Sequence, residues 1–124
     1  MKYDIVSALL SLRPNKNFQY FPDVGGYKGI NYQDTDTCPT EDELNTELTR
    51  LTNAEPMRLL RIERDQRLAS CDWRVIMAKE TGSNIPAAWK TYRQALRDLP
   101  ASASPKLNSN GDLDFSSVTW PTQP

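Results

Sequence analysis

The sequence contains no histidine, and only two of its 124 residues are cysteines. Histidine is the commonest general acid–base group and the commonest zinc ligand, so its absence excludes Ser-His and Cys-His catalytic machinery. Cys38 and Cys71 form no Cys-x-x-Cys pair, which disfavours a structural zinc site. The opening residues Met-Lys-Tyr-Asp do not resemble a secretory signal. We therefore expect a soluble protein made in the cytoplasm, with two free thiols.

Long apolar runs and glycine-rich phosphate loops are also missing. No stretch approaches the roughly 18–20 apolar residues that cross a bilayer, so we expect no membrane partner. The one glycine cluster, Gly25, Gly26 and Gly29, lacks the spacing of a phosphate-binding loop and indicates a turn. With no carboxylate pattern typical of catalysis either, the sequence predicts neither enzyme activity nor a cofactor nor a bound metal.

The charged residues are unevenly distributed. Residues 1–56 hold five Lys/Arg and nine Asp/Glu, whereas residues 57–98 hold nine Lys/Arg and five Asp/Glu. A basic half can indicate a nucleic-acid surface. Here, however, the acidic residues Glu63 and Asp65 are interleaved with four arginines that recur every third position, namely Arg58, Arg61, Arg64 and Arg67. Such spacing spreads the arginines over about half of a helix circumference, so a nucleic-acid partner is disfavoured and an acidic protein surface is the alternative to a solvated face.

The first half predicts a helix, a hairpin and a second helix. Within residues 3–12, one helical face carries Ile5, Ala8, Leu9 and Leu12. Residues 18–33 alternate bulky and polar side chains around the glycine turn, which indicates a β-hairpin. Thr40 and Glu43 form a capping-box pattern that opens a helix. We expect this helix to end or kink near residues 53–56.

The second half predicts three further helices and a tail. Pro56 suits the first turn of a helix over 57–70, and Asp72 is placed to cap a short helix that breaks at 81–84. Pro86 opens the last helix, which Pro100 is expected to end, and one of its faces carries Ala88, Trp89, Tyr92, Ala95, Leu96 and Leu99. Residues 101–111 read as a linker, and 112–120 as a strand-like segment that docks because exposed Phe and Trp are costly.

These elements predict an α+β protein of two domains. Residues 1–55 would form a small N-terminal helix, a β-hairpin and a capped helix. Residues 56–124 would form a helical hairpin or bundle with an extended, strand-like C-terminal tail.

Four blocks of the second half carry a family pattern. They are Arg64-Asp65-x-x-Leu68, Asp72-Trp73, Ala88-Trp89-x-x-Tyr92-Arg93-Gln94-Ala95-Leu96-Arg97-Asp98-Leu99 and Val118-x-Trp120-Pro121-x-x-Pro124. In order and spacing, residues 58–124 resemble the phage tail assembly chaperone domain of tailed phages. The first half is similar to short phage proteins of the XkdW-like type through Leu12-Arg13-Pro14 and Pro39-Thr40-Glu41-Asp42-Glu43-Leu44.

The resemblance implies a bacteriophage tail or tail-fibre accessory protein that acts by protein–protein binding. Its partner would be a tail-fibre or baseplate protein, met in the host cytoplasm during assembly. The alternative is a permanent virion component, a baseplate or tail-fibre adaptor without a chaperone role. A homo-oligomer is left open.

Two sets of residues follow from the matched blocks. The structural set, expected to build one aromatic core that clamps the tail, comprises Trp73, Trp89, Tyr92, Leu96, Trp120 and Pro121. The candidate partner-binding set comprises Arg93, Gln94, Arg97, Asp98, Arg64 and Asp65. Arg64 and Asp65 could form ion pairs with the charged residues of the last helix, Arg93, Arg97 and Asp98. The alternative is that the charged residues of the last helix are exposed, since surface ion pairs stabilise a protein by only about 0–1 kcal/mol.

Overall fold

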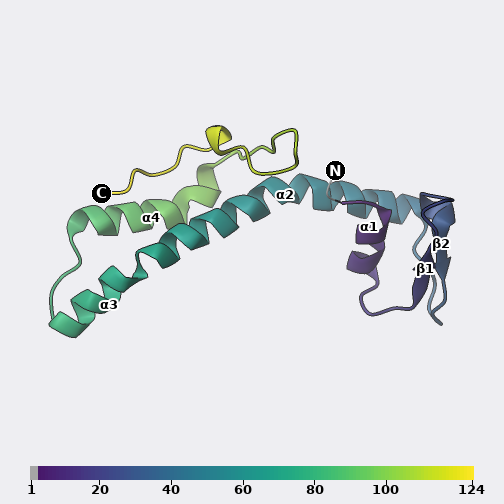
Figure 1. Ribbon diagram of the computed structural model, residues 1–124, viewed down its shortest axis with the longest axis horizontal. Helices are drawn as coiled ribbons and strands as arrows, with labels where there is room; N and C mark the ends of the chain where they lie inside the picture. Colours follow the sequence, from purple (N-terminus) through teal and green to yellow (C-terminus); the bar gives the residue numbers. More distant parts are fainter. Residues whose placement is uncertain (1–2) are drawn as a thin grey trace. The chain divides into compact units, whose positions relative to one another are not determined.

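The computed structural model describes residues 3–124, which divide into a first unit ending at Glu55 and a second unit beginning at Pro56 (Figure 1). The predicted α+β class is confirmed: a small helix and an antiparallel hairpin precede longer helices. In chain order the regular elements are α1 (Ile5–Leu12), β1 (Phe18–Tyr20), β2 (Ile30–Tyr32), α2 (Glu41–Ser70), α3 (Asp72–Thr81) and α4 (Ala87–Ser102).

Helix α1 is stabilised by a capped N-terminus and by burial of its apolar face. The Asp4 carboxylate accepts from the Ser7 amide at 2.9 Å, and the Ser7 hydroxyl accepts from the Asp4 amide at 3.2 Å, which completes a capping box. Ala8 and Leu9 are fully buried against Leu44 of α2 and make the core of the first unit. The predicted apolar face of this helix is confirmed.

The hairpin is confirmed as well. Strands β1 and β2 are antiparallel, with Gln19 opposite Asn31 at the centre of the register. The connection uses Gly25 and Gly26 at positive φ, a conformation that glycine adopts without strain. Gly29 lies so close to the strand that a Cβ there would meet the Phe21 carbonyl at 2.8 Å.

Helix α2 begins where predicted but continues further. The Thr40 hydroxyl accepts from the Glu43 amide at 3.2 Å, and Glu41 opens the helix. Of the end or kink expected near residues 53–56, the end is wrong, because α2 runs to Ser70 with Pro56 inside it. Proline removes one backbone hydrogen bond, but fully buried Leu60 packs with Leu99 and Val118 one turn further on, and this packing offsets the local loss.

Short helix α3 begins one residue away from the predicted cap. Cys71 occupies the cap position, but its side chain makes no capping hydrogen bond to the amides of α3, and Asp72 is the first helical residue. The predicted break after Thr81 is confirmed, since Gly82 ends α3 in the left-handed conformation that often closes helices.

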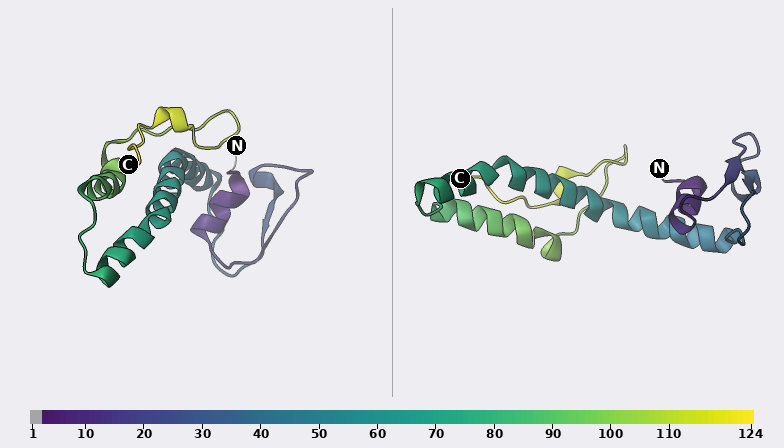
Figure 2. Two further views of the ribbon diagram at one scale, coloured as in Figure 1. Left: turned by 60° about the vertical axis from the view of Figure 1, so that its left-hand side comes forward. Right: turned by 90° about the horizontal axis from the view of Figure 1, so that it is seen from below.

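Helix α4 packs along the second half of α2 (Figures 1 and 2). Its periodic face is largely as predicted, with buried residues Trp89, Tyr92, Leu96 and Leu99. Ala88 is exposed, contrary to the prediction. Pro100 does not end the helix either, because the chain stays helical to Ser102 and the Ala103 amide donates to the Leu99 carbonyl at 3.0 Å.

The C-terminal segment docks without forming the expected strand. Between residues 103 and 124 the regular structure is one isolated bridge, Leu107 to Leu113, and a 3₁₀ turn over Phe115–Ser117. Val118 has an extended backbone and is buried, but no neighbouring strand pairs with it. Side-chain packing therefore holds the tail, rather than a ladder of backbone hydrogen bonds.

The second unit has two core clusters instead of the single aromatic core expected. One comprises Cys71, Trp89, Tyr92 and Leu96, and the other comprises Leu60, Leu99 and Val118 with Trp120 packed against it. Trp120 is thus separated from Trp89 and Tyr92, and it lies 4.2 Å under the Arg67 guanidinium and 5.7 Å from the Phe115 ring. Pro121 beside it is half-buried. Trp73 belongs to neither cluster.

Candidate partner-binding site

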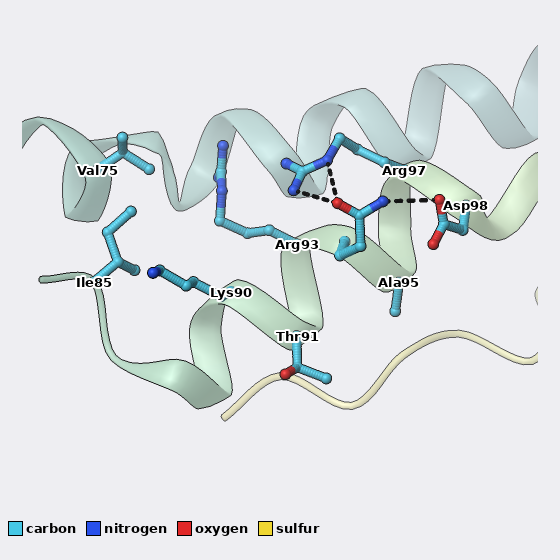
Figure 3. A pocket seen from close by; sticks show the side chains of 9 residues that line it. Val75, Ile85, Lys90, Thr91, Arg93, Ala95, Arg97 and Asp98 are labelled. Atoms are coloured by element: carbon cyan, nitrogen blue, oxygen red, sulfur yellow. Dashed lines mark hydrogen bonds between the residues drawn. The ribbon is translucent and has the colours of Figure 1, made fainter.

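The second unit carries an open groove of about 790 Å³ along α4, which we call the α4 groove (Figure 3). Four of the six candidate partner-binding residues line it. The full lining is Val75, Ile85, Lys90, Thr91, Arg93, Gln94, Ala95, Arg97 and Asp98.

Gln94 organises the exposed polar row of this groove. Its side-chain oxygen accepts from Arg97 Nε at 3.3 Å and from Arg97 Nη2 at 2.9 Å. Its amide nitrogen donates to Asp98 Oδ1 at 2.9 Å. A neutral amide therefore stands between the guanidinium and the carboxylate, and all three side chains remain exposed.

Arg93 has a different role, because its side chain is only 13% exposed. One terminal nitrogen donates to the Leu68 carbonyl at 3.0 Å and to Cys71 Sγ at 2.9 Å, and the other donates to Asp72 Oδ1 at 2.8 Å. Leu68 lies in the last turn of α2, where its carbonyl accepts from the Cys71 amide at 3.2 Å instead of from a residue four positions on, and Asp72 lies in the first turn of α3. Arg93 thus fastens α4 to the corner between α2 and α3.

The pKa of Arg93 agrees with this role. Burial by itself lowers the pKa, but the hydrogen bonds to Asp72 and Cys71 outweigh it and hold the pKa above its usual value. The guanidinium is therefore always charged, and a matched carboxylate lies beside it.

The cross-helix ion pairs expected for Arg64 and Asp65 are not formed. These two residues pair with each other, with 2.9 Å between Arg64 Nη2 and Asp65 Oδ1, and neither lines the α4 groove. The ion pair between different helices is instead Arg93 with Asp72. Neighbouring side chains on one helix turn satisfy each other more readily than partners on another helix.

Helix α3 presents an exposed face that we call the apolar stripe. It consists of Trp73, Ile76 and Met77, which are 52%, 58% and 48% exposed. Their spacing of three and four residues puts them on one side of the helix. On another side, Arg74 lies 4.5 Å from the Trp73 ring centre and 3.9 Å from that of Trp89, so it stacks with both.

The sequence did not reveal this stripe, and Trp73 was wrongly expected in the core. Helix α3 also has apolar residues on its inner side, Val75 and buried Ala78. With apolar residues on both sides, periodicity cannot select the face that packs. The one available signal was the i, i+3, i+4 spacing of three large apolar residues in so short a helix.

Residues 3–124 contain no group of three or more Cys, Asp and Glu side chains placed to hold a metal ion. No helix in that range is long and apolar enough to span a bilayer. Cys38 and Cys71 are free thiols.

The second unit is thus a helical hairpin that carries the apolar stripe and the charged α4 groove. Residues 57–124, more than half of the chain, match the family model described as phage tail assembly chaperone protein, and the chain belongs to this family. No curated protein and no solved structure matches the chain. The match leaves out residues 1–56, so the likeness of that half to XkdW-like proteins stays a prediction.

Family membership gives the protein an accessory role in phage tail assembly and points to a non-catalytic function. The matched residues cover the apolar stripe and the α4 groove together.

Proposed function

We propose that the protein acts in the host cytoplasm by binding a tail-fibre or baseplate protein through its second unit. The observation that carries this proposal is the apolar stripe. Three large apolar side chains are about half exposed on ten residues of helix α3. Contiguous exposed apolar patches of this kind usually mark protein interaction sites.

A partner that covers the stripe would gain the usual free energy of apolar burial. Burying a large apolar side chain from full exposure is worth about 1.5–3 kcal/mol. Since each stripe residue is already about half buried, each would contribute about half of that free energy when the partner covers it. A large aromatic side chain such as Trp73 is also typical of the residues that dominate binding energy.

The exposed members of the α4 groove, Gln94, Arg97 and Asp98, are the second part of the proposed contact surface. Arg93 supports this surface as a positioning residue, because its donors are already occupied. Arg64 and Asp65 lie on α2 outside the groove, and we assign them no contact.

The test is co-expression with the product of the neighbouring tail-fibre gene, followed by pull-down. We expect Trp73→Ser combined with Met77→Ser to abolish capture of the fibre protein. The control is Leu10→Ser in α1, which removes an equally exposed apolar side chain from the first unit. Equal capture by both variants would refute the proposed surface.

The alternative, a permanent component of the baseplate or fibre, is separated by mass spectrometry of purified virions. An assembly factor should be absent from virions or present far below the copy number of the fibre protein. A fixed ratio to the fibre protein would establish the structural role instead.

A further inference from the structure

We propose that the α4 groove binds an acidic, extended segment of the partner that carries one large apolar side chain. This inference rests on the proposed function and names the chemistry of the partner segment. Two carboxylates of the segment would face Lys90 and Arg97, and the apolar side chain would lie against Val75 and Ile85.

The charges of the groove favour an acidic partner. The lining has three cations and one carboxylate. Arg93 is neutralised by Asp72 at 2.8 Å, but Lys90 and Arg97 have no ion-pair partner among residues 3–124. Asp98 is held by the Gln94 amide rather than by Arg97. Two exposed cations in this part of the protein are therefore left without a carboxylate.

Gln94 keeps one of these cations available and oriented. Because its oxygen accepts from two nitrogens of Arg97, the guanidinium is held in one direction on the helix surface. Its amide group is fixed in turn by Asp98. A guanidinium ordered in this way loses less side-chain entropy when it binds a carboxylate.

The spacing of the two cations sets the spacing of the carboxylates. Lys90 and Arg97 are seven residues apart on α4, which places them on one side of the helix and about 10 Å apart along its axis. An extended chain in the polyproline II conformation advances about 3.1 Å per residue and repeats every three residues. Carboxylates three residues apart therefore lie on one side of such a chain and span about 9 Å. A segment of the form acidic–apolar–x–acidic therefore fits.

The apolar part of the lining specifies the residue next to the carboxylate that faces Lys90. Val75 of α3 and Ile85 of the connecting segment lie at one end of the groove, beside Lys90 (Figure 3). Both side chains are half-buried, so their remaining surface offers an apolar contact. A branched aliphatic side chain would cover this surface and gain hydrophobic free energy.

A nucleic acid fits the same groove less well. Phosphodiester binding uses a run of cations that neutralise successive phosphates. Here only two cations are available, the Asp98 carboxylate lies on the wall, and the apolar side chains would contact nothing. The mixed lining is that of a peptide site.

The experiment measures binding of a fluorescein-labelled peptide containing Glu-Ile-Ser-Glu to the full chain by fluorescence anisotropy. We expect weak binding that falls as salt rises from about 50 to about 300 mM, because exposed charge pairs are screened. Matched peptides containing Gln-Ile-Ser-Gln and Glu-Ser-Ser-Glu should each bind about tenfold more weakly.

Lys90→Glu combined with Arg97→Glu should abolish peptide binding. The control combines Arg61→Glu with Lys106→Glu, which makes the same change in net charge at exposed positions outside the groove. Circular dichroism of both variants checks that the helices are intact. Loss of binding in the first variant alone supports the proposal.

Several outcomes would overturn it. They are equal affinity for the Gln peptide, retained binding by the Lys90/Arg97 variant, tighter binding of a single-stranded oligothymidine, or self-association that the same variant abolishes in analytical ultracentrifugation. If that variant still captured the fibre protein while the Trp73/Met77 variant did not, the groove assignment would fail and the proposed function would stand.

Discussion

Arg93 donates to three acceptors at the corner between α2 and α3, and it supplies the counter-charge of the Asp72 carboxylate. Replacing Arg93 by Met keeps most of the side-chain length but removes the counter-charge of Asp72 and leaves the Leu68 carbonyl with the Cys71 donors alone. We expect a loss of about 2–3 kcal/mol in the free energy of unfolding, measured by urea titration. The control Arg97→Met should change it by less than about 0.5 kcal/mol, because that side chain is exposed. Equal losses would contradict the role given to Arg93.

Trp89 and Trp73 of the second unit should respond very differently to truncation. Trp89 is buried edge-to-face against Tyr92, with ring centres 5.7 Å apart. Trp89→Ala or Tyr92→Ala should therefore lower the free energy of unfolding by about 3–5 kcal/mol. Trp73→Ala should cost less than about 1 kcal/mol, since its ring is half exposed. An unchanged melting temperature for Trp89→Ala would place that ring on a binding surface.

Glu47 gives the first unit a dependence on pH. Its carboxylate accepts from Arg50 and Ser11, and these hydrogen bonds lower its pKa from 4.5 to about 2. Because the pKa is lower in the folded state, the stabilisation is complete above pH 4.5 and is lost as the pH falls toward 2.

We therefore expect the melting temperature, followed by far-ultraviolet circular dichroism, to fall over that acid range. Glu47→Gln should make the melting temperature depend less steeply on pH over this range. Part of the dependence should remain in the variant, because backbone hydrogen bonds also lower the pKa of Asp34. An identical slope in the variant would remove Glu47 from the explanation.

At the scale of single residues, the sequence predicted most of the buried side chains of α1 and α4, because both helices have one apolar face, although Ala88 of α4 is exposed. It could not separate Trp89 from Trp73, since helix α3 is apolar on two sides. The burial of Arg93 was equally hidden. It depends on a corner of the chain formed 21 to 25 residues earlier, at Leu68 to Asp72.

Helix α2 passes through Pro56, which weakens it at that point. Proline inside a helix removes a hydrogen bond and crowds the preceding turn, yet it also restricts the unfolded chain. Pro56→Ala should therefore stabilise the protein by a net of about 1–2 kcal/mol and should not lower its helix content. Far-ultraviolet circular dichroism and urea unfolding provide the measurement.

The matched control is Pro86→Ala. Pro86 stands at the cap of α4, where a missing amide proton does no harm, so no gain is expected. A destabilised Pro56→Ala variant would mean that the proline ring itself is required by the fold.

Helix starts were more predictable than helix ends in this chain. Thr40 and Pro86 act through contacts within one turn, and that local chemistry is visible in the sequence. The stops expected at Pro56 and Pro100 failed because helix continuation also depends on packing beyond the proline. Leu60 and Leu99 supply such packing by lying together in one core cluster.

At the scale of the whole molecule, we propose that residues 56–124 form an independent domain. Both core clusters of the second unit draw all their members from this range, and the family match lies within it. A fragment starting at Pro56 would also place the proline in a first helical turn, where it is well tolerated.

The test compares amide nuclear magnetic resonance spectra of a fragment spanning residues 56–124 and of the full chain. The fragment's signals should be well dispersed and should overlay those of the full chain except near residue 56. A collapsed spectrum, or one shifted throughout, would show that the second unit depends on the first. Cleavage of the full chain by a dilute protease offers an independent check of the same boundary.

The sequence predicted the family of the protein better than it predicted the exposed surfaces of the second unit. The matched blocks of residues 58–124 predicted the phage tail assembly chaperone family, which the family model confirms. The stripe and the groove emerged only from the folded second unit, because each combines residues whose exposure depends on how the helices pack.

The distribution of tryptophan makes the second unit optically distinct. All three indoles, Trp73, Trp89 and Trp120, lie in it. Emission excited at the red edge of the absorption band therefore reports on that unit alone, without any label. A partner that covers the half-exposed Trp73 would shift part of this emission to the blue and shield it from acrylamide, so the chain carries an intrinsic probe of its own docking.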